Sequence, residues 1–506
     1  MNTSNTQKRS YSLFIVPLLI AGMHGYASFI WDAQPLVLWT DSLVYLLVLG
    51  VAGFLVYASG KEHLRDPWKQ ISRSRLGMAS LVFLLSFVII GLLDSIHFRL
   101  PVENNSQQIA NELNTEIQYG TETDSMLDIW LGPLKTNVEK TYSAPFSAYQ
   151  FTKETIEHDD GSRSREYPRL IFGGAHLEHP ESEISADVLS LAIKGMILGF
   201  FAWLVLVGVV CIRRQKKLAK SFKQTFLDIL YGKTESALNI VLLAIGFIFI
   251  FIGFSAELAT KYHIFGTDKV GQDVFYQSIK SIRTGLVIGT LTTLIMLPFA
   301  VMLGIMAGYF RGRIDDLIQY LYTTLSSIPG VLLIAAAVLI MQVYMANNPD
   351  LFETDVERAD LKLFFLCVIL GITSWTGLCR MLRGESLKLT SVEYVQASQA
   401  LGVSHLQIIW KHIQPNVAHI ILIAVVLDFS GLVLAEAVLS YIGIGVDPSM
   451  HSWGNMINSA RLEMAREPIV WWSLLAAFIF MFILVLSANL FSDAVRDAFD
   501  PRIRKQ

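Results

Sequence analysis

The sequence predicts an all-α polytopic membrane protein with about ten transmembrane helices. The chain has 506 residues, of which 53% are hydrophobic and only 16% are charged. Its apolar residues are concentrated in blocks of about 20 residues, the length that crosses a hydrocarbon core as a helix. Such blocks must be helical because unpaired backbone groups are too costly in lipid, and the sequence has no alternating strands typical of a membrane barrel.

Ten apolar segments are expected to span the membrane. A cleaved signal peptide is an alternative for the first of them, but cleavage would leave nine spans and would place the basic cluster at 213–223 outside. In chain order the predicted spans cover approximately residues 12–30, 37–59, 77–97, 188–212, 238–257, 283–308, 317–343, 362–381, 417–442 and 469–490.

Lysine and arginine clusters orient these spans, because short cytoplasmic loops carry an excess of basic residues. With ten spans, every basic cluster falls on the same side. Both termini are therefore expected in the cytoplasm, together with the polar segment 393–416. The clusters lie at residues 8–9, 61–75, 213–223, 311–313, 380–383 and 496–505.

Two regions are expected on the opposite side of the membrane. Residues 98–187 contain more than twice as many acidic as basic residues and could form a small domain or a loosely ordered loop. Residues 258–282 form a turn-rich unit that leads into an amphipathic helix near Val274. Its Asp268 and Asp273 lack the dozen-residue pattern of a calcium loop, so no metal site is predicted. The three cysteines lack metal-ligand spacing.

The segment EYVQASQALGVSHLQIIWKHIQPN, residues 393–416, is amphipathic and lies between two predicted spans. Gly402 is predicted to separate two short helices, and Pro415 to end the second. The alternative is a surface hairpin without a partner. Small residues would let another protein approach closely, and apolar residues at helical spacing would supply the contact. The small residues are Ala397, Ser398, Ala400 and Gly402; the apolar ones are Leu401, Leu406, Ile408, Ile409 and Ile413.

From about residue 236 to the end, the chain resembles the inner-membrane permeases of binding-protein-dependent ABC importers, specifically the C-type permeases of the dipeptide, oligopeptide and nickel group. Five ordered blocks carry the resemblance. The first two are Gly266, Thr267, Asp268, Gly271, Asp273 and Val274, then Ala307, Gly308, Tyr309, Gly312 and Asp315. The third, which resembles the coupling loop, is Glu393, Tyr394, Ala397, Ala400, Leu401, Gly402, His412, Ile413, Pro415 and Asn416. The last two run from Glu436 to Met456 and from Arg496 to Arg502.

The resemblance implies a six-helix type I importer core at residues 236–506, with a coupling loop at about 390–416. Residues 1–235 have no counterpart in the usual family member, so four helices and the insert 98–187 are interpreted as an accessory module. Ser398 departs from the family pattern, which usually has alanine there. The substrate is not specified, because the matching residues belong to coupling and scaffold elements.

A peptide permease in the bacterial inner membrane is the function that the resemblance implies. Its expected partners are a second homologous permease, two cytoplasmic ATPase subunits, an extracytoplasmic solute-binding protein and membrane lipid, with no nucleic acid. No catalytic residue and no cofactor is expected in this chain, because ATP and Mg²⁺ would be used by the ATPase subunits. Gly232, Lys233 and Thr234 look like the end of a phosphate-binding loop, but Leu227 occupies the position of the required earlier glycine.

Two acidic residues inside the ninth predicted span are candidates for the translocation path, because ionisable groups are costly in lipid. Asp428 could line that path or pair with a neighbouring helix, whereas Glu436 is more readily interpreted as organising the outer end of its helix. Nickel or glycoside import, a membrane sensor that has lost transport, and a secondary transporter or channel are the alternatives. The last would predict inverted repeats, which the two halves do not show.

Overall fold

A computed structural model describes residues 22, 23, 25, 32–60, 62–101, 119–120, 122–157, 163–218, 221–349, 352 and 354–499. The first predicted span, 12–30, lies almost entirely outside these residues, and so do residues 102–118 of the predicted insert. Within the described part of the chain, nine helical segments are long and apolar enough to cross a membrane. They correspond in order to the second through tenth predicted spans, and the multi-pass helical class is confirmed.

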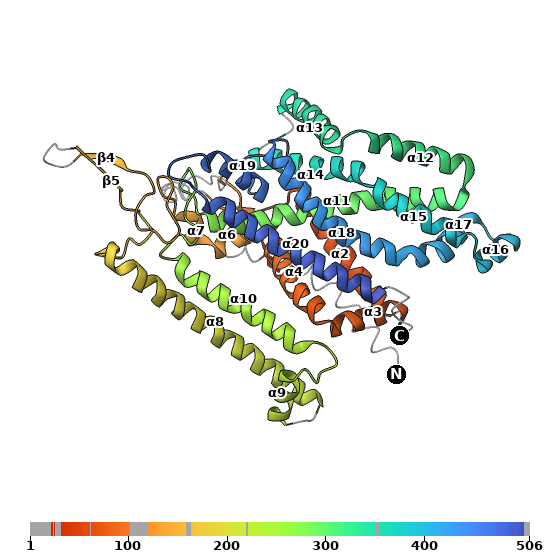
Figure 1. The fold of residues 1–506 in the computed structure, drawn as a ribbon, viewed down its shortest axis with the longest axis horizontal. Coiled ribbons are helices and arrows are strands. Elements are labelled where there is room, and N and C mark those ends of the chain that lie inside the picture. The colour runs from red at the N-terminus through yellow and green to blue at the C-terminus, as the bar shows by residue number, and fades with distance from the viewer. Residues whose placement is uncertain are drawn as a thin grey trace, which may run out of the picture.

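The helices run roughly parallel to one another (Figure 1). Helix α16 lies at one end of the bundle, and the short strands β4 and β5 lie at the other. The helices are α2 (Trp39–Ser59), α3 (Glu62–Arg73), α4 (Arg75–Asp94), α6 (Met126–Trp130), α7 (Gly132–Thr136), α8 (Pro180–Leu218), α9 (Phe222–Leu230), α10 (Leu238–Ala259), α11 (Val274–Phe310), α12 (Gly312–Ser327), α13 (Gly330–Asn347), α14 (Asp355–Ser374), α15 (Thr376–Leu389), α16 (Glu393–Ala400), α17 (His405–Ile408), the π-helix η2 (Ile409–Ile413), α18 (Gln414–Tyr441), α19 (Trp453–Glu463) and α20 (Trp472–Phe499).

The predicted seventh span, 317–343, is wrong in its position. The chain instead forms the amphipathic helix α12, which ends at Ser327, and a separate spanning helix α13, which begins at Gly330. Pro329 lies between them. Its ring cannot continue the hydrogen-bond ladder of α12 and disfavours helix at Ile328, which is extended. Hydropathy averaged over a window merges the apolar end of α12 with α13, which explains the error.

Helix α11 is the central element of the bundle, and it packs against α15, α18, α14 and α4. It is 37 residues long and contains Pro298 in its interior. Asp273 caps its first turn by accepting a hydrogen bond from the Tyr276 backbone N–H at 3.0 Å. At 1.5 Å per residue, a helix of this length extends for about 55 Å, well beyond a hydrocarbon core of roughly 30 Å.

Helices α8 and α10 form a pair on one side of the bundle (Figure 1). A Cβ atom on Gly195 would overlap the Gly253 carbonyl oxygen, and one on Gly199 would overlap that of Phe249. The two backbones therefore touch, as small residues allow in membrane helices. Near the other end of the contact, Trp203 Nε1 donates to the Leu242 carbonyl oxygen at 2.7 Å.

Two small antiparallel sheets lie in the extramembrane segments and leave the helical fold class unchanged. The first contains β1 (Gln34–Leu36), β2 (His97–Arg99) and β3 (Asp124–Ser125) in that order. The second is a hairpin of β4 (Glu154–Glu157) and β5 (Arg163–Glu166). The described part of the acidic insert is thus ordered, and it packs on the segment that precedes α11.

Helices of the N-terminal half contact those of the C-terminal half directly. Helix α4 packs against α20, α11 and α10, while α2 packs against α14. The proposed division of the chain at residue 235 stays a prediction, but any accessory module must share a continuous interface with the core.

Candidate functional site

The predicted hairpin is present at one end of the bundle. Helix α16 ends at Ala400, and α17 begins at His405. Between them Gly402 has φ 74°, a left-handed conformation that glycine adopts without the strain of a Cβ atom. The Val403 N–H donates to the Ser398 carbonyl oxygen at 3.1 Å, which closes the turn. Gly402 therefore interrupts the helix where the sequence predicts it, but only the helix before it is short, because α17 continues through η2 into α18.

The apolar residues of the hairpin divide between two faces. Leu401 is 83% exposed, and Leu406 and Trp410 are also largely exposed. By contrast, Ile408 and Ile413 are fully buried against the bundle and Ile409 is partly buried, so they do not belong to the outer contact face. This corrects the predicted single stripe, because helical spacing alone does not tell which side of a short helix faces its own protein. Trp410, which is also exposed, was not among the predicted contact residues.

Pro415 does not end the second helix, as the sequence argument expected. It lies in the first turn of α18, and the helical path continues from His405 to Tyr441. Within this continuous helix Pro415 has no N–H to donate, and the π-helical turn directly before it accommodates the missing hydrogen bond. Immediately before Pro415, the hydrogen bonds of the π-helix η2 join residues five apart instead of four. The Gln414 N–H accordingly donates to the Ile409 carbonyl oxygen.

The two arms of the hairpin are joined by polar contacts near their base. Asn416 Nδ2 donates to the Tyr394 hydroxyl at 3.0 Å and to the His412 carbonyl oxygen at 2.6 Å. The rings of Tyr394 and His412 lie 5.8 Å apart. The Ser398 hydroxyl donates to the Tyr394 carbonyl oxygen at 2.8 Å. The polar group that stands where the family usually has alanine therefore has its hydrogen-bond partner within α16. Glu393, Ala397 and Ala400 are exposed along α16.

The end of α11 supports this hairpin. The Tyr309 hydroxyl lies 2.8 Å from His405 Nδ1, at the start of α17. A Cβ atom on Gly308 would overlap the Arg383 carbonyl oxygen and Ser386 of α15, so these helices are in backbone contact. The block that contains Gly308 and Tyr309 therefore positions the hairpin, a role that the resemblance alone did not assign.

An ion pair fixes α12 to α15 beside this support. Arg383 donates through Nε and Nη2 to the two carboxylate oxygens of Asp315, at 2.5 and 2.7 Å. These hydrogen bonds hold the pKa of Asp315 below its usual range. Arg311, which has φ 55°, donates to Thr390 at 2.7 Å. Arg383 was not selected from the sequence, because its partner lies 68 residues away.

At the other end of α11, the predicted extracytoplasmic block holds the insert. The Ser143 N–H donates to the Thr267 hydroxyl at 2.6 Å, and that hydroxyl donates to the Thr141 carbonyl oxygen at 2.8 Å. Gly271 has φ 78°, and its carbonyl oxygen accepts from the Glu139 N–H at 2.9 Å. A Cβ atom on Gly271 would overlap the Glu139 backbone, and one on Gly266 that of Ser143. The block therefore forms the surface on which the insert packs.

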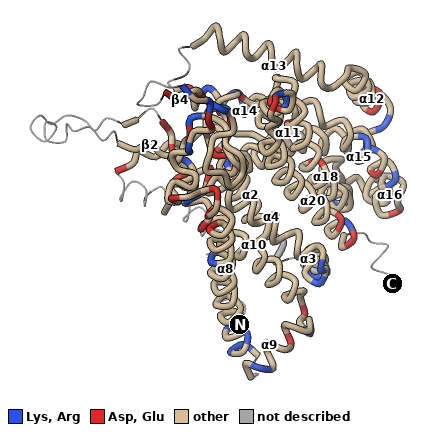
Figure 2. The backbone as a smooth tube through the Cα atoms, turned by 60° about the vertical axis from the view of Figure 1, so that its left-hand side comes forward, with Lys and Arg blue, Asp and Glu red and all other residues tan. Residues whose placement is uncertain are grey.

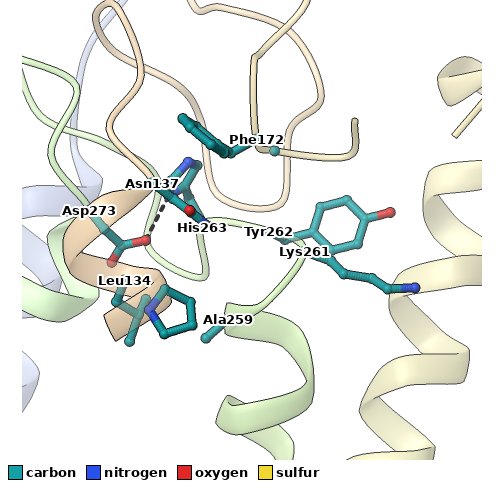
Figure 3. A pocket seen from close by; sticks show the side chains of 10 residues that line it. Leu134, Asn137, Phe172, Ala259, Lys261, Tyr262, His263 and Asp273 are labelled. Carbon is teal, nitrogen blue, oxygen red and sulfur yellow. Dashed lines mark hydrogen bonds and ion pairs between the residues drawn. The ribbon is translucent and has the colours of Figure 1, made fainter. Parts of the chain in front are cut away.

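A buried histidine connects the insert to the same block. His263 Nδ1 lies 2.7 Å from Asp273, and its Nε2 lies 3.6 Å from Glu139, an ion-pair distance longer than a hydrogen bond. Figure 3 shows His263 between Asp273 and Phe172, whose backbone N–H donates to Glu139 at 2.8 Å. Burial opposes the charged imidazole, but the bond to Asp273 and the charge of Glu139 raise the pKa of His263 to about 9.

The same contacts act on Glu139. Burial disfavours its carboxylate, but His263 and the backbone N–H groups of Ile171, Phe172 and Gly173 lower its pKa to about 2. Both partners are therefore charged at neutral pH, and each compensates the burial of the other.

The two aspartates of the block have structural partners. Asp268 accepts the backbone N–H groups of Val270 and Gln272 at 3.0 and 2.9 Å, and Gln277 Nε2 donates to it at 2.6 Å. Asp273 caps α11 and binds His263. Among the residues that the structure describes, no group of three potential metal ligands is found.

Two buried cations near the N-terminal end of α11 bind carboxylates of other helices. Arg283 Nη2 lies 2.7 Å from Asp41 of α2 and 3.5 Å from Asp360 of α14. One turn earlier, Lys280 binds Asp94 of α4 at 2.5 Å and Asp128 of α6 at 3.0 Å. These pairs connect segments far apart in the chain, and none was predicted.

The two acidic candidates of α18 lie in different surroundings. Glu436 is buried and accepts the Ser440 hydroxyl at 2.7 Å, close to Gly454 of α19. Asp428 is partly buried and, within the described residues, has no hydrogen bond or ion pair. It lies beside an exposed apolar stripe on the same helix. That stripe contains Leu427, Leu434, Val438 and Tyr441.

Residues 300–505 match the family model described as binding-protein-dependent transport system inner membrane component. The chain is 30% identical to the oligopeptide transport system permease protein OppC of Haemophilus influenzae over 250 residues, which cover 49% of this chain and 74% of that protein. It is 31% identical to OppC of Bacillus subtilis over 246 residues, 49% of this chain and 74% of that protein.

A similar match is found to the glutathione transport system permease protein GsiD of Pectobacterium atrosepticum, with 30% identity over 49% of this chain and 75% of that protein. Among solved structures, an inward-facing form of the MetNI methionine ABC transporter aligns with a TM-score of 0.34. That alignment has 15% identity and covers 44% of this chain and 97% of the other.

Proposed function

This chain belongs to the family of binding-protein-dependent transport system inner membrane components, and from that premise we propose that it is the peptide-carrying permease subunit of an ATP-driven importer. It is a multi-pass membrane protein and a transport subunit. Peptides are proposed as the cargo because the similar proteins include permeases named for oligopeptides, dipeptides and glutathione. Nickel or a glycoside remains the alternative cargo.

The observation that carries the proposal is the supported hairpin of α16 and α17. Its exposed Leu401, Leu406 and Trp410 provide an apolar contact surface at the end of the bundle, while Ile408 and Ile413 anchor it. Cytoplasmic ATPase subunits that hydrolyse ATP with Mg²⁺ would bind this surface. A rigid hairpin can then convert their movement into a movement of α11, α15 and α18.

The remaining partners are proposed from surfaces of the membrane helices. A second, related permease would cover the exposed stripe of α18 that includes Leu434 and Val438. Asp428, which borders this stripe, is proposed to face the path between the two permeases, because an ionisable group in a span needs a polar environment. Glu436 is proposed to organise the contact between α18 and α19. A solute-binding protein would deliver cargo at the end that carries the insert.

The proposed orientation places the hairpin and both termini in the cytoplasm of a bacterial cell. Basic residues support it, since Figure 2 shows Lys and Arg around α3, α9, α12 and α16, at the hairpin end of the helices. Residues 1–235 are proposed as an accessory module, and residues 236–506 as the transport core with its coupling segment at 390–416.

Gly402 offers a direct test of coupling. Its surroundings are open, so a larger side chain there strains the left-handed backbone without a clash. We expect Gly402→Leu to lower uptake of a labelled peptide about tenfold at equal protein abundance, because a non-glycine residue in this conformation costs roughly 1–2 kcal/mol. Less ATPase should also co-purify with this variant.

Gly402→Asn is the matched control, because asparagine tolerates the left-handed conformation better than other residues. It should retain most uptake and most bound ATPase. Unchanged uptake in Gly402→Leu, or equal ATPase retention by both variants, would count against the proposal.

A further inference from the structure

Helix α9 has a continuous apolar stripe that the rest of the described structure does not cover. Phe222, Phe226 and Leu230 are spaced four residues apart, lie on one side of the helix, and are between 40% and 58% exposed. Tyr231, which follows the helix, is also exposed. Gln224 and Asp228 lie on the opposite side. The helix is therefore amphipathic with its apolar side partly free.

A neighbouring face of α9 is fixed to the helix pair α8 and α10. Thr225 and Ile229 are buried, and Ile229 packs in a cluster with Val207 and Cys211 of α8 and Leu242 of α10. The exposed stripe is adjacent to this contact around the helix. Because α9 connects two helices that are long and apolar enough to cross the membrane, it lies near the level where they leave it.

Basic residues surround this position. Arg213, Lys216 and Lys217 are exposed on the last turns of α8, and Lys223 is exposed on α9 at the edge of the apolar stripe. Asp228 is the one acidic residue of the sequence between 213 and 230. Figure 2 shows Lys and Arg gathered where α8 meets α9. An apolar stripe bordered by cations fits an interface whose inner side is hydrocarbon and whose outer side is anionic.

We propose that α9 and the last turns of α8 form a binding surface for anionic phospholipids, with Phe222, Phe226 and Leu230 in the acyl region and the cations on the phosphate groups. Charge complementarity selects this occupant: a neutral protein partner would not need the basic border, and a nucleic acid would not use the apolar stripe. The inference requires membrane placement only, so it does not depend on the cargo or on the ATPase subunits.

The depth of α9 can be measured on the full-length protein in nanodiscs. Spin labels at Phe226→Cys and, as the matched control, Gln224→Cys would be compared for collision with oxygen and with a water-soluble nickel chelate. The native cysteines that the structure places are buried and can be replaced by serine in both. We expect the label at 226 to favour oxygen and the label at 224 to favour the chelate. Equal accessibility of both positions to the chelate would overturn the proposal.

The headgroup preference can be measured by native mass spectrometry with phosphatidylglycerol and phosphatidylcholine as probes. Replacing Arg213, Lys216, Lys217 and Lys223 by glutamine should reduce the preference for phosphatidylglycerol at least about tenfold. The control replaces four cations at the other end of the molecule, Lys140, Lys153, Arg163 and Arg165, and should leave the preference unchanged. Equal losses in both variants, or none in the first, would contradict the proposal; peptide uptake is not part of this readout.

Discussion

The two ends of α11 are held in different ways. At its N-terminal end, which is the outer end in the proposed orientation, Lys280 and Arg283 each bind two buried carboxylates from other segments of the chain. At the hairpin end, support comes from close helix packing at Gly308, hydrogen bonds of the Tyr309 hydroxyl and the neighbouring pair of Arg383 with Asp315. The outer end is held by buried ion pairs, whereas the hairpin end is held by apolar helix packing and individual hydrogen bonds.

This difference suggests a division of labour along one helix. Buried ion pairs have one demanding geometry and resist displacement, since separating either partner leaves an uncompensated charge. Contacts between glycine-lined helices and single hydrogen bonds can be exchanged at smaller cost. We therefore expect substitutions at the outer end to change stability and those at the hairpin end to change coupling.

Removing Arg283 should have the largest effect. Arg283→Met removes the cation that Asp41 and Asp360 share and leaves Asp41 with His97 alone, and we expect a loss of about 3 to 5 kcal/mol in stability. Thermal unfolding in detergent and the yield of folded protein measure this loss.

If this variant does not fold, combining it with Asp41→Asn and Asp360→Asn should recover folded protein, because the unpaired charges are then gone. Arg163→Gln, which removes an exposed pair in the β4–β5 hairpin, serves as the control and should unfold like the wild type. Normal stability of Arg283→Met would show that these ion pairs do not hold the outer end of α11 in place.

Alkaline pH should loosen the insert next most strongly. The pKa of His263 is raised from 6.5 to about 9, so its contribution is complete below pH 6.5 and is lost as the pH rises through 9. Glu139, lowered from 4.5 to about 2, contributes above pH 4.5 and loses its effect as the pH falls through 2. The insert is therefore held best between about pH 4.5 and 6.5, and the loss up to pH 9.5 can reach about 3 kcal/mol.

Hydrogen-exchange protection of the Phe172 and Gly173 amides reports this change, because both bond Glu139. His263→Gln should flatten the decrease in protection above pH 6.5. His176→Gln, which alters a partly exposed histidine paired with Asp187, should leave the profile as it is. A flat profile in the wild type would show that the buried pair does not hold the insert.

The pair of Arg383 and Asp315 should contribute less. Both side chains are partly accessible, and we expect a coupling energy of about 1 kcal/mol in a double-mutant cycle of Arg383→Ala and Asp315→Ala. Thermal unfolding gives the energy, and peptide uptake should fall further than the stability loss explains. A coupling energy near that of the Arg283 pairs would erase the contrast between the ends.

Ser398→Ala should have the smallest effect. The hydroxyl bonds a carbonyl oxygen of its own helix, so stability should change by less than about 0.5 kcal/mol and uptake should stay the same. The thermal midpoint and uptake of this variant, measured beside Gly402→Leu, distinguish backbone geometry from side-chain chemistry in the hairpin. A large loss of uptake would mean that Ser398 contacts a partner.

Much of this architecture could be predicted from local sequence, because hydropathy reports membrane spans directly and Gly402 marks its own turn. The predictions were wrong where one residue type is compatible with two structures. Pro415 can end a helix or lie in its first turn, and Ile408 and Ile413 can face a partner or their own bundle. The contacts of Arg283 and Lys280 could not be predicted, since Asp41 and Asp94 come from segments more than 180 residues away.

Pro298 lies between the two anchored ends of α11. It has no N–H to donate to Leu294, and its ring crowds that carbonyl group, so the helix resists bending less there than elsewhere. We expect a movement applied at the hairpin to be absorbed at this hinge, which leaves Arg283 in place. The part of α11 that follows Pro298 would then move relative to the part that precedes it, and the insert would keep its position.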